Sequence, residues 1–270
     1  MVRAAFQGER GAYSEEAVVK HFGEAAQPIP KPTIYEAVRA VEEGEADYVV
    51  IPVENTLGGS VGEALDVLLE TKLNACGEII LRIVHCLIAN PGEKLQDVEV
   101  VYSHPQALTQ CRGFLRKLGC RTVPVYDTAG GVKMVKGLRG AASIASERAA
   151  QIYGMQVLAR GIEDDPNNYT RFLVLHDGPL LRPTGRDKTS IILSVKHVPG
   201  ALYRALEPFA VRRINLTRIE SRPSRGKPWE YNFYIDFEGH VEDGVVSEAL
   251  EELIKRVSFI KVVGSYPRGT

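Results

Sequence analysis

The sequence contains few of the features that would place it in a specialised class. Its cysteines show no C-x-x-C spacing and are too few for a disulfide framework: Cys76, Cys86, Cys111 and Cys120. We therefore expect reduced thiols in a cytoplasmic protein. The six histidines are scattered and none has a partner at metal-ligand spacing, so no metal ion is expected.

Long apolar runs and nucleotide-binding loops are missing as well. No apolar run reaches the ~18 residues of a membrane span, and no signal peptide precedes the strand-like residues 2–6. There is no G-x-x-x-x-G-K-[ST] loop and no G-x-G-x-x-G after a strand, so no nucleotide cofactor is expected. The net charge of −1 is close to balance, so neither nucleic acid nor a membrane is an expected partner.

What remains is a chain with the composition of an ordinary globular protein, and its 270 residues are enough for two domains. From Val2 to Leu175, short apolar runs alternate with amphipathic helical segments, which predicts an α/β domain with a mainly parallel sheet. Residues 177–187 are rich in proline, glycine and charge and are typical of a linker. The pattern then restarts as strand, helix, two strands around a turn at 224–228, helix and strand. This ferredoxin-like βαββαβ order indicates a small regulatory or dimerising module.

Hydroxyl and amide side chains follow the predicted strands of the first domain. They are Ser14, Asn55, Thr56, Ser103, Thr128, Ser146 and Thr170. Taken singly, several are best explained as helix caps: Ser14, Ser60 and Ser146 precede helical segments, and Ser103 forms a capping-box pattern with Gln106. Together they predict a cleft of neutral donors and helix N-termini, since ligands of open α/β sheets bind beyond the carboxyl ends of the strands. Such a cleft suits a small anion such as a carboxylate.

The stretch from Asn167 to Phe172 lies where an acidic loop becomes an apolar strand. On these residues alone, Thr170 and Arg171 are better explained as the start of a strand, and the alternative is a ligand-binding loop held by a rigid scaffold. The sequence offers no Cys-His or Ser-His-Asp arrangement that would indicate covalent catalysis. The residues alone therefore lead to an anion site and no further.

Several motifs, in order along the chain, resemble the prephenate dehydratase family with a C-terminal ACT domain. They are Gly11-Ala12-Tyr13-Ser14-Glu15, Pro52-Val53-Glu54-Asn55, Ser103-His104-Pro105-Gln106-Ala107-Leu108, Asp127-Thr128-Ala129, Ala145-Ser146, Tyr169-Thr170-Arg171-Phe172, Gly200-Ala201-Leu202 and Glu220-Ser221-Arg222-Pro223. The resemblance implies a two-lobed, periplasmic-binding-protein-like catalytic domain at 1–178 and an ACT domain at 188–266. One lobe would contain residues 1–78 with 158–178, and the other residues 79–157.

The activity implied by the resemblance is the loss of carbon dioxide and water from prephenate, which gives phenylpyruvate on the route to phenylalanine. No cofactor is implied. Thr170 would donate a proton or a strong hydrogen bond to the leaving hydroxyl, and Arg171 would hold a carboxylate bidentately. Asn55, Ser103, Gln106 and Gln110 match substrate-site positions, with the two glutamines on one helix face. Phe172 would pack under the site, and Glu54 is either a site residue or a structural anchor of its loop.

In the second domain the resemblance implies feedback inhibition by L-phenylalanine at an interface between ACT domains of a homodimer or homotetramer. Gly200, Ala201 and Leu202 would begin a helix whose free amides take the carboxylate of the amino acid. The other wall would consist of Asn215, Glu220, Ser221 and Arg222. Without the resemblance, these residues are explained as an ordinary helix start and strand end.

Two alternatives remain open at this point. Arogenate dehydratase differs only in its substrate, which carries an amine in place of the keto group. A non-catalytic protein that binds a small anion is the alternative from another class, because two-lobed folds of this kind also serve as solute receptors. The missing signal peptide disfavours an exported receptor, and Thr170 with Arg171 favours catalysis.

Overall fold

The computed structural model describes residues 1–224 and 229–269. The chain forms two compact units, the first made of Met1–Ala64 and Ile79–Phe172, the second of Leu65–Glu78 and the chain from Leu173 onward. Leu65–Glu78 belongs to the second unit because its backbone is held there: Lys261 Nζ donates to the carbonyls of Leu68 and Leu69 at 2.8 and 3.1 Å. These boundaries differ from those of the domains predicted at residues 1–178 and 188–266. The predicted domain division stays a prediction.

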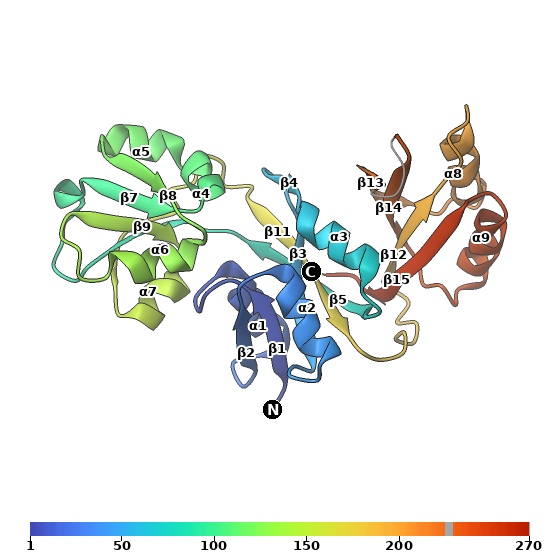
Figure 1. The fold of residues 1–270 in the computed structure, drawn as a ribbon, viewed down its shortest axis with the longest axis horizontal. Helices are drawn as coiled ribbons and strands as arrows, with labels where there is room; N and C mark the ends of the chain where they lie inside the picture. Colours follow the sequence, from blue (N-terminus) through green and yellow to red (C-terminus); the bar gives the residue numbers. More distant parts are fainter. Residues whose placement is uncertain (225–228, 270) are drawn as a thin grey trace. The chain divides into compact units, whose positions relative to one another are not determined.

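The first sheet has six strands in the order β2-β1-β3-β11-β5, with β4 paired to β3. Its strands are β1 (Arg3–Gln7), β2 (Gln27–Lys31), β3 (Tyr48–Asn55), β4 (Gly59–Ser60), β5 (Asn74–Arg82) and β11 (Tyr169–His176). The helices that alternate with them are α1 (Tyr13–Phe22), α2 (Ile34–Glu42) and α3 (Gly62–Glu70). The pairs β1–β2 and β1–β3 are parallel, as the alternating pattern predicts. Strand β11 lies late in the chain yet is placed next to β3 (Figure 1).

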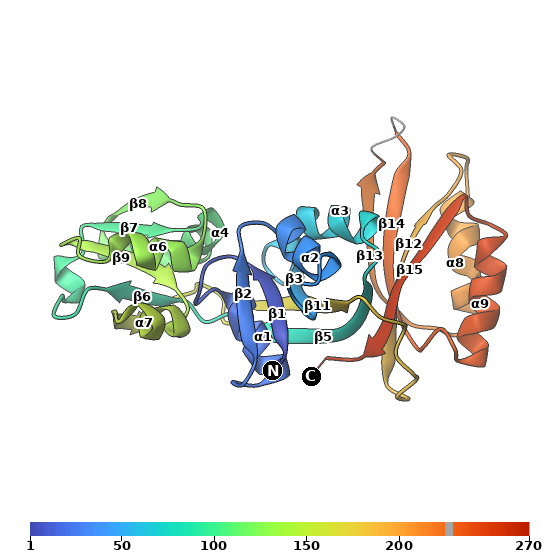
Figure 2. The same cartoon turned by 60° about the horizontal axis from the view of Figure 1, so that its bottom comes forward.

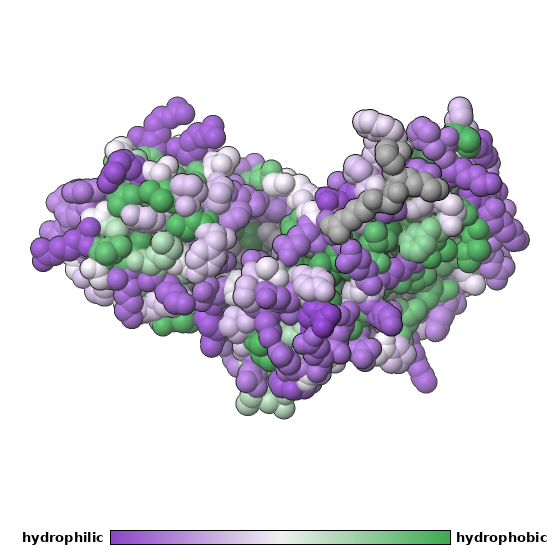
Figure 3. All heavy atoms as spheres, in the orientation of Figure 1, coloured by the Kyte–Doolittle hydropathy of each residue, from purple (hydrophilic) through white to green (hydrophobic). Residues whose placement is uncertain are grey.

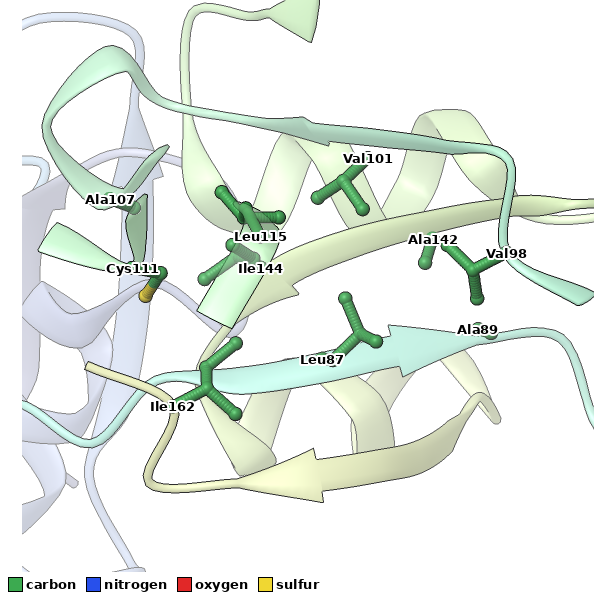
Figure 4. Close-up of a cluster of buried hydrophobic side chains, with 10 residues drawn as sticks. All are labelled: Leu87, Ala89, Val98, Val101, Ala107, Cys111, Leu115, Ala142, Ile144 and Ile162. Carbon is green, nitrogen blue, oxygen red and sulfur yellow. The ribbon is translucent and has the colours of Figure 1, made fainter. Parts of the chain in front are cut away.

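The second sheet has the order β10-β6-β9-β7-β8. Its strands are β6 (Cys86–Ala89), β7 (Val100–Ser103), β8 (Arg121–Pro124), β9 (Ala141–Ala145) and β10 (Gln156–Arg160). Its helices are η1 (Leu95–Asp97), α4 (Pro105–Gln110), α5 (Arg112–Leu118), α6 (Thr128–Val135) and α7 (Glu147–Tyr153). Leu87, Leu115, Ile144 and Ile162 point toward one another in its core (Figure 4). The chain thus builds two lobes with a sheet each, as predicted.

The helix starts agree only in part with the predicted caps. Thr33 caps α2 through its side chain, which accepts the Glu36 N–H at 3.1 Å. Ser14 is not an N-cap, because α1 already begins at Tyr13 and Ala12 holds the cap position. The predicted box of Ser103 with Gln106 is also wrong: His104 caps α4, and its Nδ1 accepts the Gln106 N–H at 3.3 Å.

The C-terminal part has the predicted βαββαβ order. Its elements are β12 (Asp187–Ser194), α8 (Ala201–Val211), β13 (Leu216–Pro223), β14 (Tyr231–Glu238), α9 (Gly244–Ile254) and β15 (Phe259–Pro267). The antiparallel sheet has the order β13-β14-β12-β15, and α8 and α9 lie side by side on one face of it (Figure 2). Phe209, Phe237 and Leu253 belong to the core between sheet and helices. Residues 225–228 of the predicted turn lie outside the described residues.

Hydrophilic side chains cover most of the face seen in Figure 3, and hydrophobic ones gather in patches, one of them over the C-terminal sheet and α9. Exposed apolar residues of this part include Val211, Ile219 and Val245. None of the described helices is both long enough and apolar enough to cross a membrane.

Candidate active site

A cavity of about 310 Å³ lies in the first unit, with walls from both of its sheets. Its polar lining includes Tyr13 and Ser14 of α1, Asn55 of β3, His85 between β5 and β6, Gln106 and Gln110 of α4, Thr128 of α6 and Thr170 of β11. Phe172 contributes an apolar wall and is only 1% exposed. Seven residues expected from the sequence therefore lie around one cavity: Ser14, Asn55, Gln106, Gln110, Thr128, Thr170 and Phe172.

Asn55 is the centre of the hydrogen bonds in this cavity. Its Oδ1 accepts the backbone N–H groups of Leu57 and Gly58 at 3.0 and 2.8 Å. Its Nδ2 donates to Asn168 Oδ1 at 2.8 Å and to Thr170 Oγ1 at 3.0 Å. Because backbone N–H groups only donate, they fix which end of the Asn55 amide is oxygen. The amide nitrogen must then face Thr170.

Gln106 and Gln110 lie on one face of α4, as their spacing predicts, and both Nε2 atoms donate to Asn55 Oδ1 at 3.3 Å. Gly58 makes this approach possible. A Cβ at that position would lie 2.1 Å from Gln106 Nε2, well inside contact distance. The turn after β3 thus needs a glycine so that a glutamine can cover it.

Thr170 faces the cavity because side chains alternate along β11, so that Thr170 and Phe172 share one face. Its hydroxyl oxygen accepts from Asn55, which occupies a lone pair and leaves the hydroxyl proton for another acceptor. A ligand in the cavity can be that acceptor.

Arg171 lies on the opposite face of β11, and it is not among the described residues that line the cavity. Its Nη1 lies 3.4 Å from Glu54 Oε1 on the neighbouring strand β3, and its side chain is 6% exposed. This placement differs from the expected bidentate grip on a substrate carboxylate. It follows from the strand order, since β11 lies next to β3 and brings Arg171 beside Glu54.

Ser103 also differs from its expected place in the site. It is fully buried at the end of β7, and its hydroxyl donates to the Ile144 carbonyl of the neighbouring β9 at 2.6 Å. Within the described part of the chain, it is absent from the cavity wall. Its hydroxyl links two strands of the second sheet.

The sequence did not single out Tyr13 with His85, yet the two meet in the wall of the cavity. Tyr13 Oη lies 2.8 Å from His85 Nδ1, and the rings pack edge to face with centroids 5.5 Å apart. His85 Nε2 lies 2.8 Å from Gln110 Oε1. Burial lowers the pKa of His85 and raises the pKa of Tyr13. No local pattern connects these residues, because they come from segments 72 positions apart.

The described lining contains carboxylates, Glu63 and Asp127, and neither lysine nor arginine. Glu63 Oε1 accepts the Ile34 N–H at 3.1 Å, and Asp127 caps α6 by accepting the Gly130 N–H at 2.7 Å. Burial raises the pKa of Asp127. Among the described lining residues, attraction for an anion can therefore come from neutral donors and from the N-terminus of α1, since the Asp127 carboxylate already caps α6.

No group of three or more His, Cys, Asp or Glu side chains within residues 1–224 and 229–269 is arranged to hold a metal ion.

A second cavity, of about 500 Å³, lies in the C-terminal unit at the start of α8. Gly200, Ala201 and Leu202 line it, together with Tyr231 and Phe233 of β14. The remaining four predicted residues are absent from the described lining: Asn215, Glu220, Ser221 and Arg222. Asn215 is exposed before β13, and the other three lie on β13, where Arg222 Nη2 is 3.3 Å from Asp66 Oδ1.

The fold and the sites define a class of protein: a two-lobed α/β domain with a polar ligand cavity, followed by a small βαββαβ domain with a cavity of its own. Comparison with known proteins makes the class specific. A family model described as prephenate dehydratase matches residues 4–179, and one described as ACT domain matches residues 189–255. The chain belongs to the prephenate dehydratase family with a C-terminal ACT domain.

Individual relatives agree with this assignment. The chain is 45% identical to "Arogenate dehydratase/prephenate dehydratase 2, chloroplastic" of Arabidopsis thaliana, over 100% of this chain and 74% of that protein. A solved prephenate dehydratase from Arthrobacter aurescens in complex with L-Phe superposes with a TM-score of 0.91 at 34% identity, covering 99% of this chain and 90% of that one. A solved structure described as GqqA, a quorum quenching acylase, superposes with a TM-score of 0.92 at 35% identity, covering 99% and 98%.

Proposed function

We propose that the chain converts prephenate to phenylpyruvate, with Thr170 as the hydrogen-bond or proton donor to the leaving hydroxyl. The observation that carries the proposal is the bond from Asn55 Nδ2 to Thr170 Oγ1 at 3.0 Å. Asn55 cannot accept a proton through its Nδ2, so the threonine hydroxyl is held as a donor toward the cavity.

The reaction requires the protein to orient the substrate and to supply one proton or hydrogen-bond donor. Cleavage of the bond to the ring carboxylate releases carbon dioxide and leaves its electron pair in the ring. That pair forms the aromatic system as the carbon–oxygen bond to the ring hydroxyl breaks. The hydroxide takes up one proton and leaves as water. General-acid help of this kind typically accelerates a reaction by ~10²–10⁴-fold.

Substrate carboxylates have recipients in the cavity other than Arg171. The N-terminus of α1 supplies backbone N–H groups, and the hydroxyls of Ser14 and Thr128 line the same cavity. Arg171 instead pairs with Glu54. Since Glu54 precedes Asn55 and Arg171 follows Thr170, this pair supports the register in which Asn55 reaches Thr170.

Arogenate remains a second candidate substrate, because the printed name of the Arabidopsis relative includes both activities. An acylase needs an activated nucleophile. Among the described cavity residues, His85 is hydrogen-bonded to Tyr13 and Gln110, and no serine or threonine hydroxyl is hydrogen-bonded to a histidine. The described cavity therefore favours dehydration over acyl transfer.

For the C-terminal domain we propose feedback inhibition by L-phenylalanine in the cavity at the start of α8. Gly200 caps this 11-residue helix with a φ of +76°, and the N-terminal amides of α8 suit a carboxylate. Tyr231 and Phe233 give the same cavity an aromatic wall for an apolar ring. The solved relative with L-Phe bound supports this choice of effector.

We propose further that a second copy of the chain supplies the wall formed by Glu220, Ser221 and Arg222. Strand β13 is at the edge of its sheet, and its residue Ile219 is 48% exposed. An edge strand with an exposed apolar side chain is suited to pair with another strand. Homodimers through the ACT domains would follow, and they would be seen as a doubled mass in light scattering.

The test incubates purified protein with prephenate and, separately, with arogenate, each with and without L-phenylalanine. Phenylpyruvate from prephenate, formed more slowly when L-phenylalanine is present, is the expected result. Phenylalanine formed from arogenate alone would assign the second activity. No aromatic product from either substrate would refute the enzyme proposal.

A further inference from the structure

His85 is a buried histidine in the wall of the cavity, on the segment between β5 and β6, and it is 2% exposed. Both ring nitrogens have partners: Nδ1 meets Tyr13 Oη and Nε2 meets Gln110 Oε1, each at 2.8 Å. A histidine whose two nitrogens are both engaged holds one ring orientation. The direction of each hydrogen bond depends on which ring nitrogen carries the proton.

The backbone settles the orientation of the amides that lead to His85. Asn55 Oδ1 accepts from two backbone N–H groups, so Asn55 Nδ2 faces Asn168 Oδ1. The other end of the Asn168 amide, Nδ2, then donates to Gln110 Oε1 at 2.9 Å. Gln110 Nε2 donates back to Asn55 Oδ1 at 3.3 Å. Each amide in this ring of three thus has a single orientation that satisfies its neighbours.

Gln110 therefore presents its oxygen to His85, and only an N–H at Nε2 can meet it. The neutral ring with hydrogen on Nε2 has an acceptor at Nδ1, which takes the hydroxyl proton of Tyr13. Burial favours the neutral ring by lowering the pKa of His85. The tautomer of His85 is consequently set by Gln110, because the Tyr13 hydroxyl also lies 3.0 Å from the Val84 carbonyl and by itself fits either tautomer.

We propose that His85 is a positioning residue for the dehydratase reaction: its Nε2–H holds the Gln110 amide in place, and through the contact of Gln110 with Asn55 it supports the position of Asn55 beside the Thr170 hydroxyl. The inference rests on the proposed role of Thr170 for its effect on turnover, while the tautomer itself can be observed without any activity. Loss of the His85 donor removes one of the groups that hold Gln110 Oε1, so the Gln110 side chain can shift even though Asn168 and Asn55 still fix which end of its amide is oxygen. A shift of Gln110 weakens its bond to Asn55 Oδ1 and loosens the position of Asn55 beside Thr170.

The test compares two substitutions that differ in reach. His85→Gln places an amide N–H near the position of Nε2, whereas His85→Asn is one methylene shorter and leaves Gln110 without its donor. We expect His85→Gln to keep kcat within roughly 5-fold, and His85→Asn to lose roughly 10–100-fold in kcat with KM nearly unchanged, as misplacement of a reacting group does. His21→Gln, at a histidine of α1 outside the cavity lining, is the matched control.

Two outcomes would overturn the proposal. One is equal kcat in the two variants, either unchanged or equally reduced, because the N–H at Nε2 would then not matter. The other comes from ¹⁵N NMR of the wild-type ring, assigned by the signal that disappears in the His85→Gln protein. At neutral pH we expect hydrogen on Nε2 and a bare Nδ1, and a ring with hydrogen on Nδ1 contradicts the proposal even if His85→Asn does not fold. If Thr170 is shown not to act, the tautomer result still stands on its own.

Discussion

Asn55 and Thr170 are 115 positions apart in the chain, yet the Asn55 side-chain amide donates to the Thr170 hydroxyl at 3.0 Å. The Tyr169 carbonyl lies 3.0 Å from the same amide nitrogen, whose two hydrogens are shared among Asn168, Tyr169 and Thr170, so it contacts both the backbone and a side chain of β11. This contact makes the end of β3 and the start of β11 one functional unit.

Asn55→Asp tests the direction of that hydrogen bond. The substituted carboxylate would keep an oxygen for the N–H groups of Leu57 and Gly58 but would no longer donate to Thr170. Thr170 would then give its proton to the new carboxylate instead of the substrate. We expect a loss of ~10²–10³ in kcat, comparable to removal of an oxyanion-hole donor. Asn74→Asp, which removes a bond to the Gly178 carbonyl in the other unit, is the control and should leave kcat unchanged.

Arg171→Met separates a structural role of the arginine from a direct grip on the substrate. Its partner Glu54 is partly exposed, so we expect a loss of only about 1–3 kcal/mol in the free energy of unfolding, measured by urea denaturation. In a double-mutant cycle the further change Glu54→Gln should cost much less in the Arg171→Met background. A KM raised more than roughly 100-fold with unchanged stability would instead place Arg171 on a carboxylate of the substrate.

The pH dependence of stability reports on His85. Burial holds its pKa below the ordinary 6.5, against smaller opposing effects of the Gln110 hydrogen bond and the Glu163 carboxylate. The charged and titratable groups that face it are Glu163, which accepts the backbone N–H of His85 at 2.9 Å, and Tyr13. Between its folded and unfolded pKa values the folded state binds fewer protons, so the free energy of unfolding must rise with pH there.

His85→Gln should flatten this rise in the window just below pH 6.5, because glutamine does not titrate. His21, whose pKa burial also lowers, contributes equally to both proteins and cancels in the difference. Urea denaturation at several pH values between about 5 and 8 measures the two slopes. Identical slopes for the two proteins would contradict a neutral, buried His85.

Gly200→Val tests the effector cavity. The φ of +76° at Gly200 disfavours a β-branched residue, and a Cβ there would lie 2.8 Å from Arg204 Nη1. We expect the concentration of L-phenylalanine for half-inhibition to rise at least roughly 10-fold while uninhibited kcat stays the same, because the first unit is untouched. Gly137→Val introduces similar backbone strain in the first unit, away from both cavities, and should leave inhibition intact. Retained inhibition in Gly200→Val would place the effector elsewhere.

The strand and helix order could be predicted from the sequence, because it depends on local periodicity. The pattern of polar strand ends indicated Asn55 and Thr170, the resemblance to a family added Gln110, and the structure places all three around one cavity. Neither supplied the partners of Arg171 and Ser103, because those depend on which strands become neighbours. The contact of His85 with Tyr13 was missed for the same reason, since no local pattern indicates that the segment after β5 meets the start of α1.

Turnover of prephenate by Thr170 variants tests the central claim most directly. The measurement is phenylpyruvate formed per second by the wild-type protein, by Thr170→Ser and by Thr170→Val, with folding checked by thermal unfolding. Valine keeps the shape of threonine without the hydroxyl, so we expect kcat to fall by ~10²–10⁴-fold, whereas serine keeps the donor and should retain most activity. Near-normal turnover by Thr170→Val, or no phenylpyruvate from the wild-type protein, would contradict the account.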